Sequence, residues 1–278
     1  MSTTGFKGHI EVFLSPAGVQ PEELNGRTAV VIDVLRASST IIFALSQGAR
    51  EVIPVANLGE AGRMASTLDS ASYVLGGERG GKQIEGYQLG NSPLEYTADR
   101  VADKTVILST TNGTPAIQAA AAAGELLVGG FVNARALAQA VRDAGNDVTI
   151  VCAGWENRVS LEDTLCAGFL VDLLLDGSSP ANLSDTAYMA LWQYRHDQHD
   201  LSVPISRCNH ARRLEELGHG LDIPLCIEID AWPVVPKLHE SRLVLTAASE
   251  QRLSHAADLE ITPVAPESGD SGELSSAG

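Results

Sequence analysis

Short apolar segments alternate with longer stretches of helical periodicity along the first two thirds of this 278-residue chain. Most of the apolar segments are rich in Val and Ile and apolar on both faces, which is typical of buried strands in parallel sheets. The sequence predicts strands at 9–14, 29–34, 51–55, 72–75, 105–109, 126–129 and 148–152. It predicts helices at 38–48, 58–68, 115–123, 134–144 and 161–175. This alternation favours a layered α/β fold with a largely parallel or mixed sheet.

The last third of the chain changes character. Helices are expected at 184–200 and 206–217, and strands at 223–229 and 242–246. No linker is long enough to require a domain boundary, so we take residues 1–262 as one domain, with 177–182 as the best candidate for a seam between sub-domains. Pro, Glu, Ser and Gly dominate 263–278, and we expect this tail to be disordered.

The formal net charge of −16 argues against non-specific nucleic-acid binding, which requires a basic surface. The acidity suits a high-salt habitat and an ordinary acidic protein equally well. No segment approaches the roughly 18 consecutive apolar residues of a membrane span, and residues 1–10 show no secretory signal. The four cysteines stand far apart without a CxxC pair, so reduced thiols are expected. We therefore expect a soluble cytoplasmic protein, compatible with a homo-oligomer.

Polar clusters follow several predicted strands, where ligands of open α/β sheets bind. In the first cluster, Asp33 ends an apolar strand and is suited to hold a metal ion, while Arg36 is suited to bind an oxyanion through two hydrogen bonds. Ser38 or Ser39 is suited to cap the following helix, and Ser38 is also a candidate substrate-binding residue. The alternative interpretation is that Asp33 and Arg36 simply pair with each other.

A second cluster, at 109–115, has three hydroxyl side chains followed by an Asn-Gly pair and Thr114 at a strand-to-helix turn. Thr114 is predicted to be the N-cap, with Pro115 at the first helical position. Free backbone amides at such a turn suit a phosphate group, although capping alone explains part of the composition. The candidate phosphate-binding residues are Thr110, Thr111, Asn112, Gly113 and Thr114.

The third cluster, at 76–82, has four glycines around an adjacent acidic and basic residue, which indicates a mobile loop able to close over an anion. Glu78 is a candidate metal ligand. Arg79 or Lys82 is a candidate phosphate contact. An ordinary surface loop is the alternative.

The fourth cluster, at 151–163, contains Cys152 and Arg158 at the C-x5-R spacing of cysteine-dependent phosphatases. A small buried residue at a strand end is the favoured interpretation of Cys152. Ser160 is predicted to cap the next helix, where Glu162 and Asp163 favour the positive helix end and are within reach of a metal ion. The histidines between 196 and 255 show no spacing that indicates a metal site.

Taken together, the segments 32–42, 76–93, 109–116, 151–168 and 229–236 resemble the 2-phosphosulfolactate phosphatase family in order and spacing, up to about residue 262. The combination of Asp-Val-Leu-Arg-Ala-Ser, Gly-Glu-Arg-Gly, Gly-Asn-Ser-Pro and Ser-Thr-Thr-Asn-Gly-Thr carries the resemblance. It implies a three-layer α/β/α fold and a Mg²⁺-dependent acid phosphatase that converts 2-phosphosulfolactate to sulfolactate on the coenzyme M route. Pro115 stands where many relatives have a basic residue, and Arg158 lies in a variable stretch.

We therefore expect a Mg²⁺-dependent phosphomonoesterase that acts on a small anionic phosphorylated acid. Arg36, Arg79 and the 110–114 loop would hold the phosphate and the second acid group. Leu35 stands where a haloacid-dehalogenase-type phosphatase has a second Asp, which disfavours Asp33 as nucleophile. Two alternatives are a non-catalytic binding protein for a phosphorylated metabolite and a cysteine phosphatase. The expected metal ligands are Asp33 and Glu78 first, then Glu162 or Asp163.

Overall fold

The computed structural model describes residues 6–156, 158–177 and 182–260. The strands in these residues are β1 (Ile10–Phe13), β2 (Thr28–Ile32), β3 (Glu51–Pro54), β4 (Tyr73–Arg79), β5 (Lys82–Gln83), β6 (Thr105–Ser109), β7 (Glu125–Gly129), β8 (Val148–Cys152), β9 (Pro236–His239) and β10 (Arg242–Leu245). The helices are α1 (Ala37–Ser46), α2 (Leu58–Ala65), α3 (Ala98–Val101), α4 (Gly113–Ala119), α5 (Ala134–Ala144), α6 (Leu161–Leu175), α7 (Asp185–Asp197), α8 (Ser202–Ser206), α9 (Asn209–Glu216), α10 (Asp222–Cys226) and α11 (Ala247–Glu260).

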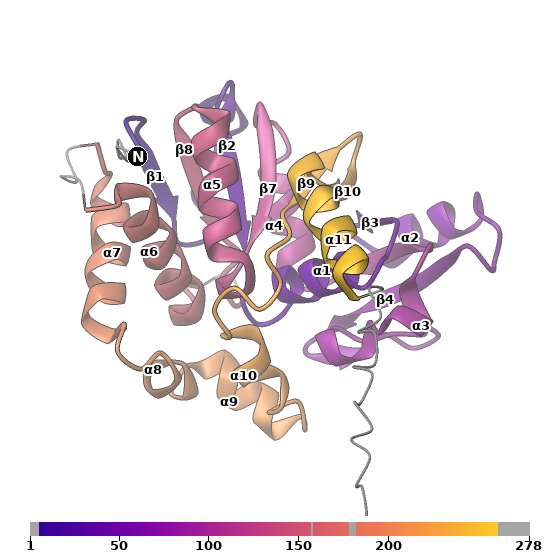
Figure 1. Ribbon diagram of the computed structural model, residues 1–278. Coiled ribbons are helices and arrows are strands. Elements are labelled where there is room, and N and C mark those ends of the chain that lie inside the picture. Colours follow the sequence, from indigo (N-terminus) through magenta and orange to yellow (C-terminus); the bar gives the residue numbers. More distant parts are fainter. Residues whose placement is uncertain (1–5, 157, 178–181, 261–278) are drawn as a thin grey trace, which may run out of the picture.

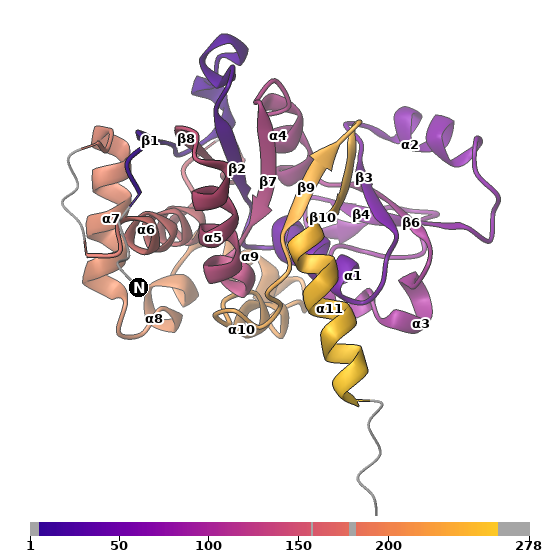
Figure 2. The ribbon, with the colours of Figure 1, turned by 45° about the horizontal axis from the view of Figure 1, so that its top comes forward.

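Within the described residues, ten strands form one mixed sheet in the order β1-β8-β2-β7-β9-β10-β3-β6-β4-β5. Strands β1, β8, β2 and β7 run parallel and are called the first block. Strands β3, β6 and β4 also run parallel and are called the second block. The antiparallel β9–β10 hairpin lies between the two blocks, as Figures 1 and 2 show. The predicted α/β class with a largely parallel, mixed sheet is thus confirmed.

Helices cover both faces of the first block because its strands are apolar on both sides. In β2, Val30 and Ile32 belong to the core shared with α5 and α6, and Ala29 and Val31 belong to the core shared with α1 and α4. Successive side chains of a strand point to opposite faces, so an unbroken apolar run is buried on both. At one end of the sheet, α8, α9 and α10 lie together (Figure 1).

The periodic segments of the first two thirds fold as the sequence predicts. Strands β6 and β8 and helices α5 and α6 have the predicted bounds. At the start of α6 the Ser160 hydroxyl accepts the Asp163 N–H at 3.2 Å, which confirms the predicted cap. Helix α4, in contrast, begins at Gly113 with Asn112 as its N-cap, so the prediction of Thr114 as N-cap was wrong.

The prediction of a strand at 223–229 was also wrong, because that segment begins inside helix α10. Its buried faces do not alternate: Ile223 and Cys226 are buried, three residues apart, as on one side of a helix. Strand β9 was missed because it has four residues and begins with Pro236, which disfavours a strand. The proposed seam and tail fall largely or wholly on 178–181 and 261–278, outside the described residues.

No helix among the described residues is both long enough and apolar enough to cross a lipid bilayer.

Candidate functional site

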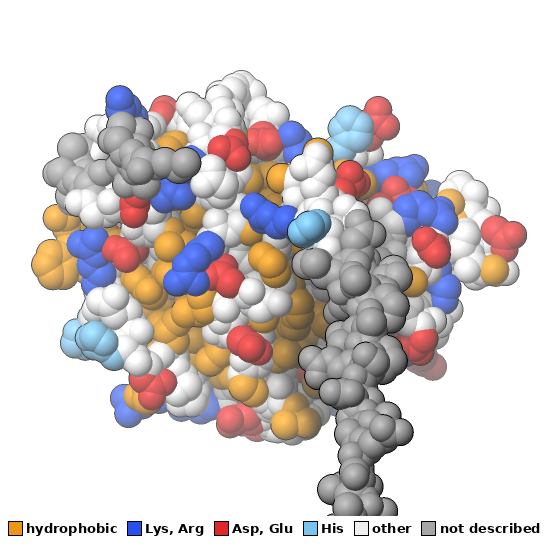
Figure 3. Space-filling view, viewed as in Figure 1, with side chains coloured by type: hydrophobic (Ala, Val, Ile, Leu, Met, Phe, Trp, Pro, Cys, Tyr) orange, Lys and Arg blue, Asp and Glu red, His pale blue; other side chains and the backbone are white. Residues whose placement is uncertain are grey.

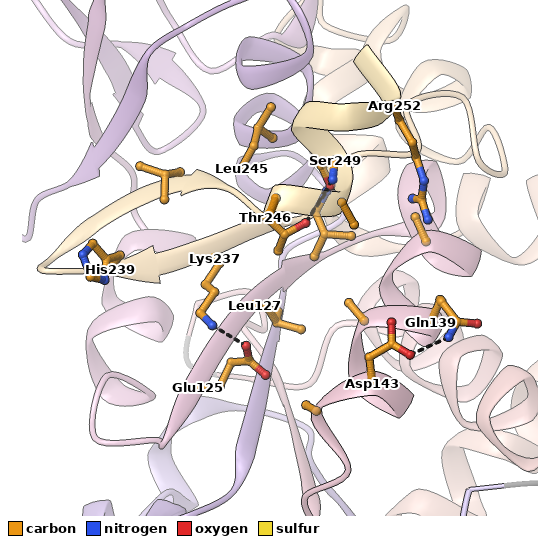
Figure 4. A pocket seen from close by; sticks show the side chains of 17 residues that line it. Glu125, Leu127, Gln139, Asp143, Lys237, His239, Leu245, Thr246, Ser249 and Arg252 are labelled. Carbon is orange, nitrogen blue, oxygen red and sulfur yellow. Dashed lines mark hydrogen bonds and ion pairs between the residues drawn. The ribbon is translucent and has the colours of Figure 1, made fainter. Parts of the chain in front are cut away.

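Two hollows of different character are considered as the candidate active site. One, of about 450 Å³, lies between α5, the start of β7, the β9–β10 hairpin and α11 (Figure 4). Its charged groups pair with neighbours: Lys237 Nζ lies 2.6 Å from Glu125 Oε1, and Gln139 donates to Asp143 at 2.7 Å. Around α5 the surface mixes apolar side chains with scattered charges (Figure 3). The lining of this hollow comes from segments outside the four polar clusters, so we do not assign the chemistry to it.

The second hollow, of about 140 Å³, gathers residues from all four polar clusters, with Trp155 and Glu156 coming from the fourth. We call it the central cavity. It lies where loops after β2 and β8 of the first block meet β4 and the loop after β6 of the second block. Residues that line it include Asp33, Arg36, Glu78, Asn91, Thr111 and His210.

Asp33 follows β2 directly and is buried at the start of α1. Its backbone N–H donates to the Ser38 hydroxyl at 2.9 Å, and one carboxylate oxygen accepts only a long bond from Ala37 N–H, 3.4 Å away. Burial raises the pKa of Asp33 to about 6, opposed by the positive charge of His210 and reinforced by the negative charge of Glu78. Asp33 is thus a carboxyl group with spare acceptor capacity facing a cavity.

Gly113 explains how α4 comes so close to Asp33. A Cβ atom at Gly113 would lie 2.7 Å from Asp33 Oδ2 and 2.4 Å from Ala37 Cβ, closer than atoms in contact allow. The glycine is therefore required by close packing against the site, and its side-chain position is filled by the carboxylate.

Arg36 does not pair with Asp33. Its Nη1 donates to Asp222 Oδ2 at 2.6 Å, and both side chains are at most 3% exposed. Ser92 donates to the other Asp222 oxygen, also at 2.6 Å. Asp222, which the sequence did not single out, therefore fixes Arg36 at the cavity wall from helix α10.

Glu78 is also buried, but its oxygens are fully used. One accepts the Thr111 N–H at 2.7 Å, and the other accepts the Thr111 hydroxyl at 3.0 Å and the Gly81 N–H at 2.7 Å. Arg79 is exposed and donates to the Ser109 hydroxyl at 2.8 Å. Glu78 thus ties two loops of the second block together at the cavity.

The proposed phosphate loop is only partly turned toward the cavity. Thr110 and Thr114 cap each other: the Thr114 N–H donates to Thr110 Oγ1 at 3.0 Å, and the Thr110 N–H donates to Thr114 Oγ1 at 3.1 Å. Thr111 and Asn112 line the cavity. Five other candidate site residues are not among those that line the central cavity: Ser38, Arg79, Thr110, Gly113 and Thr114.

Glu162 and Asp163 take different roles at the start of α6. Glu162 Oε1 lies 3.2 Å from His210 Nδ1, and the His210 ring stacks on Trp155 with centroids 5.7 Å apart. Burial alone would raise the pKa of Glu162, but the hydrogen bond and charge of His210 hold it below its usual value. Asp163 accepts the Val34 and Gly154 amides at 2.8 and 3.1 Å.

Burial raises the pKa of Asp163 well above its usual value, with the charges of Glu162 and Asp33 adding to the effect. The described residues contain no group of three or more His, Cys, Asp or Glu side chains arranged to hold a metal ion. The four predicted carboxylates therefore do not form one metal cluster built of protein ligands alone.

Asn91 supplies an oxygen that sequence reasoning did not assign. Its side chain is 5% exposed and lines the central cavity, and its Oδ1 atom has no hydrogen-bond partner within the described residues. Buried amide oxygens are rarely left unpaired. An unpaired acceptor in the cavity that Asp33 also lines therefore indicates a position for a ligand atom.

Cys152 is fully buried at the end of β8, and burial raises the pKa of its thiol well above the usual value, with the charge of Asp163 adding to the shift. A nucleophilic cysteine requires the opposite, a thiolate at neutral pH. The structure therefore argues against a cysteine phosphatase.

Comparison with known proteins matches residues 13–241 to the family model described as 2-phosphosulpholactate phosphatase. A probable 2-phosphosulfolactate phosphatase from Clostridium novyi is 38% identical over 234 residues, covering 84% of this chain and 98% of its own length. A protein of the same description from Caldanaerobacter subterraneus subsp. tengcongensis is 40% identical over 222 residues, covering 79% and 91%. This chain belongs to the 2-phosphosulfolactate phosphatase family.

The family match includes both the residues that sequence reasoning found and those it missed. Asn91 lies in the Gly-Asn-Ser-Pro segment that carries the resemblance to the 2-phosphosulfolactate phosphatase family, and that motif was a usable signal. His210 and Asp222 sit in the C-terminal third without any local motif. His210 lines the cavity and contacts Glu162, 48 residues away in the chain, and Asp222 contacts the lining residue Arg36, 186 residues away.

Proposed function

We propose that this chain is a Mg²⁺-dependent phosphatase that hydrolyses 2-phosphosulfolactate or a similar phosphorylated 2-hydroxy acid. The observation that carries the proposal is that two groups with free hydrogen-bond acceptor capacity line one cavity. They are the Asp33 carboxylate and the Asn91 Oδ1 atom, which has no partner within the described residues. Relatives that cover most of this chain are described as probable 2-phosphosulfolactate phosphatases, which supports the substrate class.

These residues fit Mg²⁺ even though they form no large protein cluster. Mg²⁺ favours oxygen ligands and commonly uses one or two carboxylates, with water and substrate phosphate completing its shell. Asp33 and Asn91 would hold it, while Glu78 already uses both oxygens within the protein. When bound, the ion would neutralise charge on the phosphate group and help to orient the attacking water.

The chain's own residues would bind and orient the ester. Arg36, fixed by Asp222, would offer its remaining donors to a phosphate oxygen. Glu162 binds one ring nitrogen of His210; in this proposal the other nitrogen donates a hydrogen bond to the leaving oxygen. The stacked Trp155 would keep the His210 ring in that orientation.

Phosphate release tests the proposal. We expect the purified protein to release inorganic phosphate from 2-phosphosulfolactate with Mg²⁺, to lose at least about 99% of that rate after EDTA dialysis, and to regain it when Mg²⁺ is restored. Full activity after exhaustive chelation would overturn the metal assignment. Tight binding of the ester without any phosphate release would instead support a non-catalytic binding protein.

A further inference from the structure

A third hollow, of about 230 Å³, adjoins the central cavity, and we call it the side pocket. Trp155 and His210 line both spaces, so the two spaces meet at their stacked rings. The rest of the side pocket includes Arg158, Arg207 and Asn209. A group bound in it would therefore sit next to the rings that face the central cavity.

The loop after β8 brings Arg158 to this pocket. Trp155 and Arg158 exchange two backbone hydrogen bonds, each 3.0 Å long, which closes a tight loop. Gly154 makes the loop possible, because its φ is +69° and a Cβ there would lie 2.4 Å from the Arg158 carbonyl oxygen. The same tight turn thus positions the Trp155 ring and the Arg158 side chain together.

Arg207 comes from a different segment, the turn between α8 and α9. Both arginines are exposed, and neither guanidinium forms an ion pair within the described residues. The acid in the pocket lining, Glu162, is buried and bonded to His210. On a chain of net charge −16, two arginines without acidic partners at one pocket form a local site for an anion.

We propose that the side pocket binds the second acid group of the substrate, a carboxylate or sulfonate on the carbon chain that carries the phosphate ester. Arg158 and Arg207 bind this group while the phosphate occupies the central cavity. This inference rests on the proposed function and assigns substrate recognition to residues outside the central cavity. It also differs from the expectation that Arg36, Arg79 and the 110–114 loop hold both the phosphate and the second acid group, because Arg36 lines the central cavity, where the phosphate is placed, and Arg79 lines neither space.

Three esters separate this role from general binding of phosphate. 2-Phosphosulfolactate carries a carboxylate and a sulfonate, 2-phosphoglycerate carries only the carboxylate, and glycerol 2-phosphate carries neither. We expect Arg158→Gln and Arg207→Gln each to raise KM about tenfold for at least one of the acid-bearing esters, with kcat little changed. For glycerol 2-phosphate we expect kcat/KM to fall no more than about twofold. A rise in KM for both acid-bearing esters identifies the carboxylate as the bound group. A rise for 2-phosphosulfolactate alone identifies the sulfonate.

Arg63→Gln on α2 is the matched control, because it removes the same charge from an exposed arginine far along the chain from both spaces. Thermal unfolding of each variant checks that the fold is kept. Equal losses on all three esters, or no loss on any, would overturn the inference.

Calorimetric titration with sulfolactate gives a result independent of turnover. We expect wild type and Arg63→Gln to bind sulfolactate, and Arg158→Gln and Arg207→Gln to bind it about tenfold more weakly. If wild type hydrolyses none of the esters but shows this binding pattern, the proposed function fails and the side pocket stands. If it hydrolyses them but the binding is insensitive to both arginines, the side pocket fails and the phosphatase proposal stands.

Discussion

The two parallel blocks contribute carboxylates of opposite character to the same cavity. Asp33, from the first block, has few hydrogen bonds and a pKa raised by burial to about 6. Glu78, from the second block, accepts three hydrogen bonds from Thr111 and Gly81. A buried carboxylate that is fully bonded holds structure together, and one that is not is available to a ligand. The comparison of Asp33 with Glu78 shows that a position at a strand end is not enough to assign a chemical role to a carboxylate.

The largest expected effect is on catalysis by Asp33→Asn. The amide keeps the shape of the side chain but removes its charge, and with it the proposed attraction for Mg²⁺. We expect kcat/KM for 2-phosphosulfolactate to fall about a thousandfold, or roughly 4 kcal/mol of transition-state stabilisation. An Asp33→Asn enzyme with nearly full activity would break the distinction between the two carboxylates.

The same substitution should stabilise the metal-free protein at alkaline pH. Because the folded pKa of Asp33 is about 6, above its ordinary value of 3.8, ionisation costs stability as pH rises from about 4 through 6. At pH 8 we expect the free energy of unfolding of Asp33→Asn to exceed that of wild type by on the order of 2 kcal/mol. We expect this difference to disappear near pH 4. Chemical denaturation of both proteins in EDTA at pH 8 and pH 4 measures this difference in the free energy of unfolding.

A smaller effect, mainly on stability, is expected for Glu78→Gln. The amide nitrogen cannot accept the N–H groups of Thr111 or Gly81, so at least one partly buried donor loses its partner. We expect a loss of about 1–3 kcal/mol in the free energy of unfolding, and a smaller loss of catalysis than Asp33→Asn gives. Chemical denaturation and phosphate release on the same samples test this order, which the reverse result would contradict.

The smallest effect is expected for Gly113→Ala. A single methyl group must displace Asp33 or Ala37, and we expect kcat/KM to fall about tenfold, or roughly 1.4 kcal/mol. Gly62→Ala is the matched control, since Gly62 lies within α2 with open space where its Cβ would be. The control should keep full activity, because α2 does not line the central cavity. Equal kinetics in both variants would show that Asp33 tolerates movement.

Much of the fold could be predicted because its signals are local. The periodicity and capping of α6 depend on Ser160 and Asp163, three residues apart, and the helix has the predicted bounds. The segment at 223–229 misled because its apolar spacing suits either a strand or a helix turn. The segment overlaps helix α10, whose first residue, Asp222, is held by Arg36 and Ser92 from distant parts of the chain.

The site could be predicted only where its residues follow strands. Asp33, Arg36, Glu78, Thr111 and Asn112 are brought to one cavity as the strand-end argument expects. Sequence alone could not tell which hydroxyls would be consumed by caps, as Thr110 and Thr114 are. It also could not reveal His210 or Asp222, because a tertiary contact has no signature in the spacing of neighbouring residues.

The β9–β10 hairpin has a consequence for how the chain is made. It lies in the middle of the sheet but comes from Pro236–Leu245, and it meets its neighbours through the single residue pairs Lys237–Leu127 and Leu243–Val52. Until these residues leave the ribosome, β7 and β3 lack their central neighbours, and an unpaired strand edge invites association with other chains. The strands at the centre of the sheet are therefore synthesised last, and the two blocks can be joined only after β9 and β10 have been made.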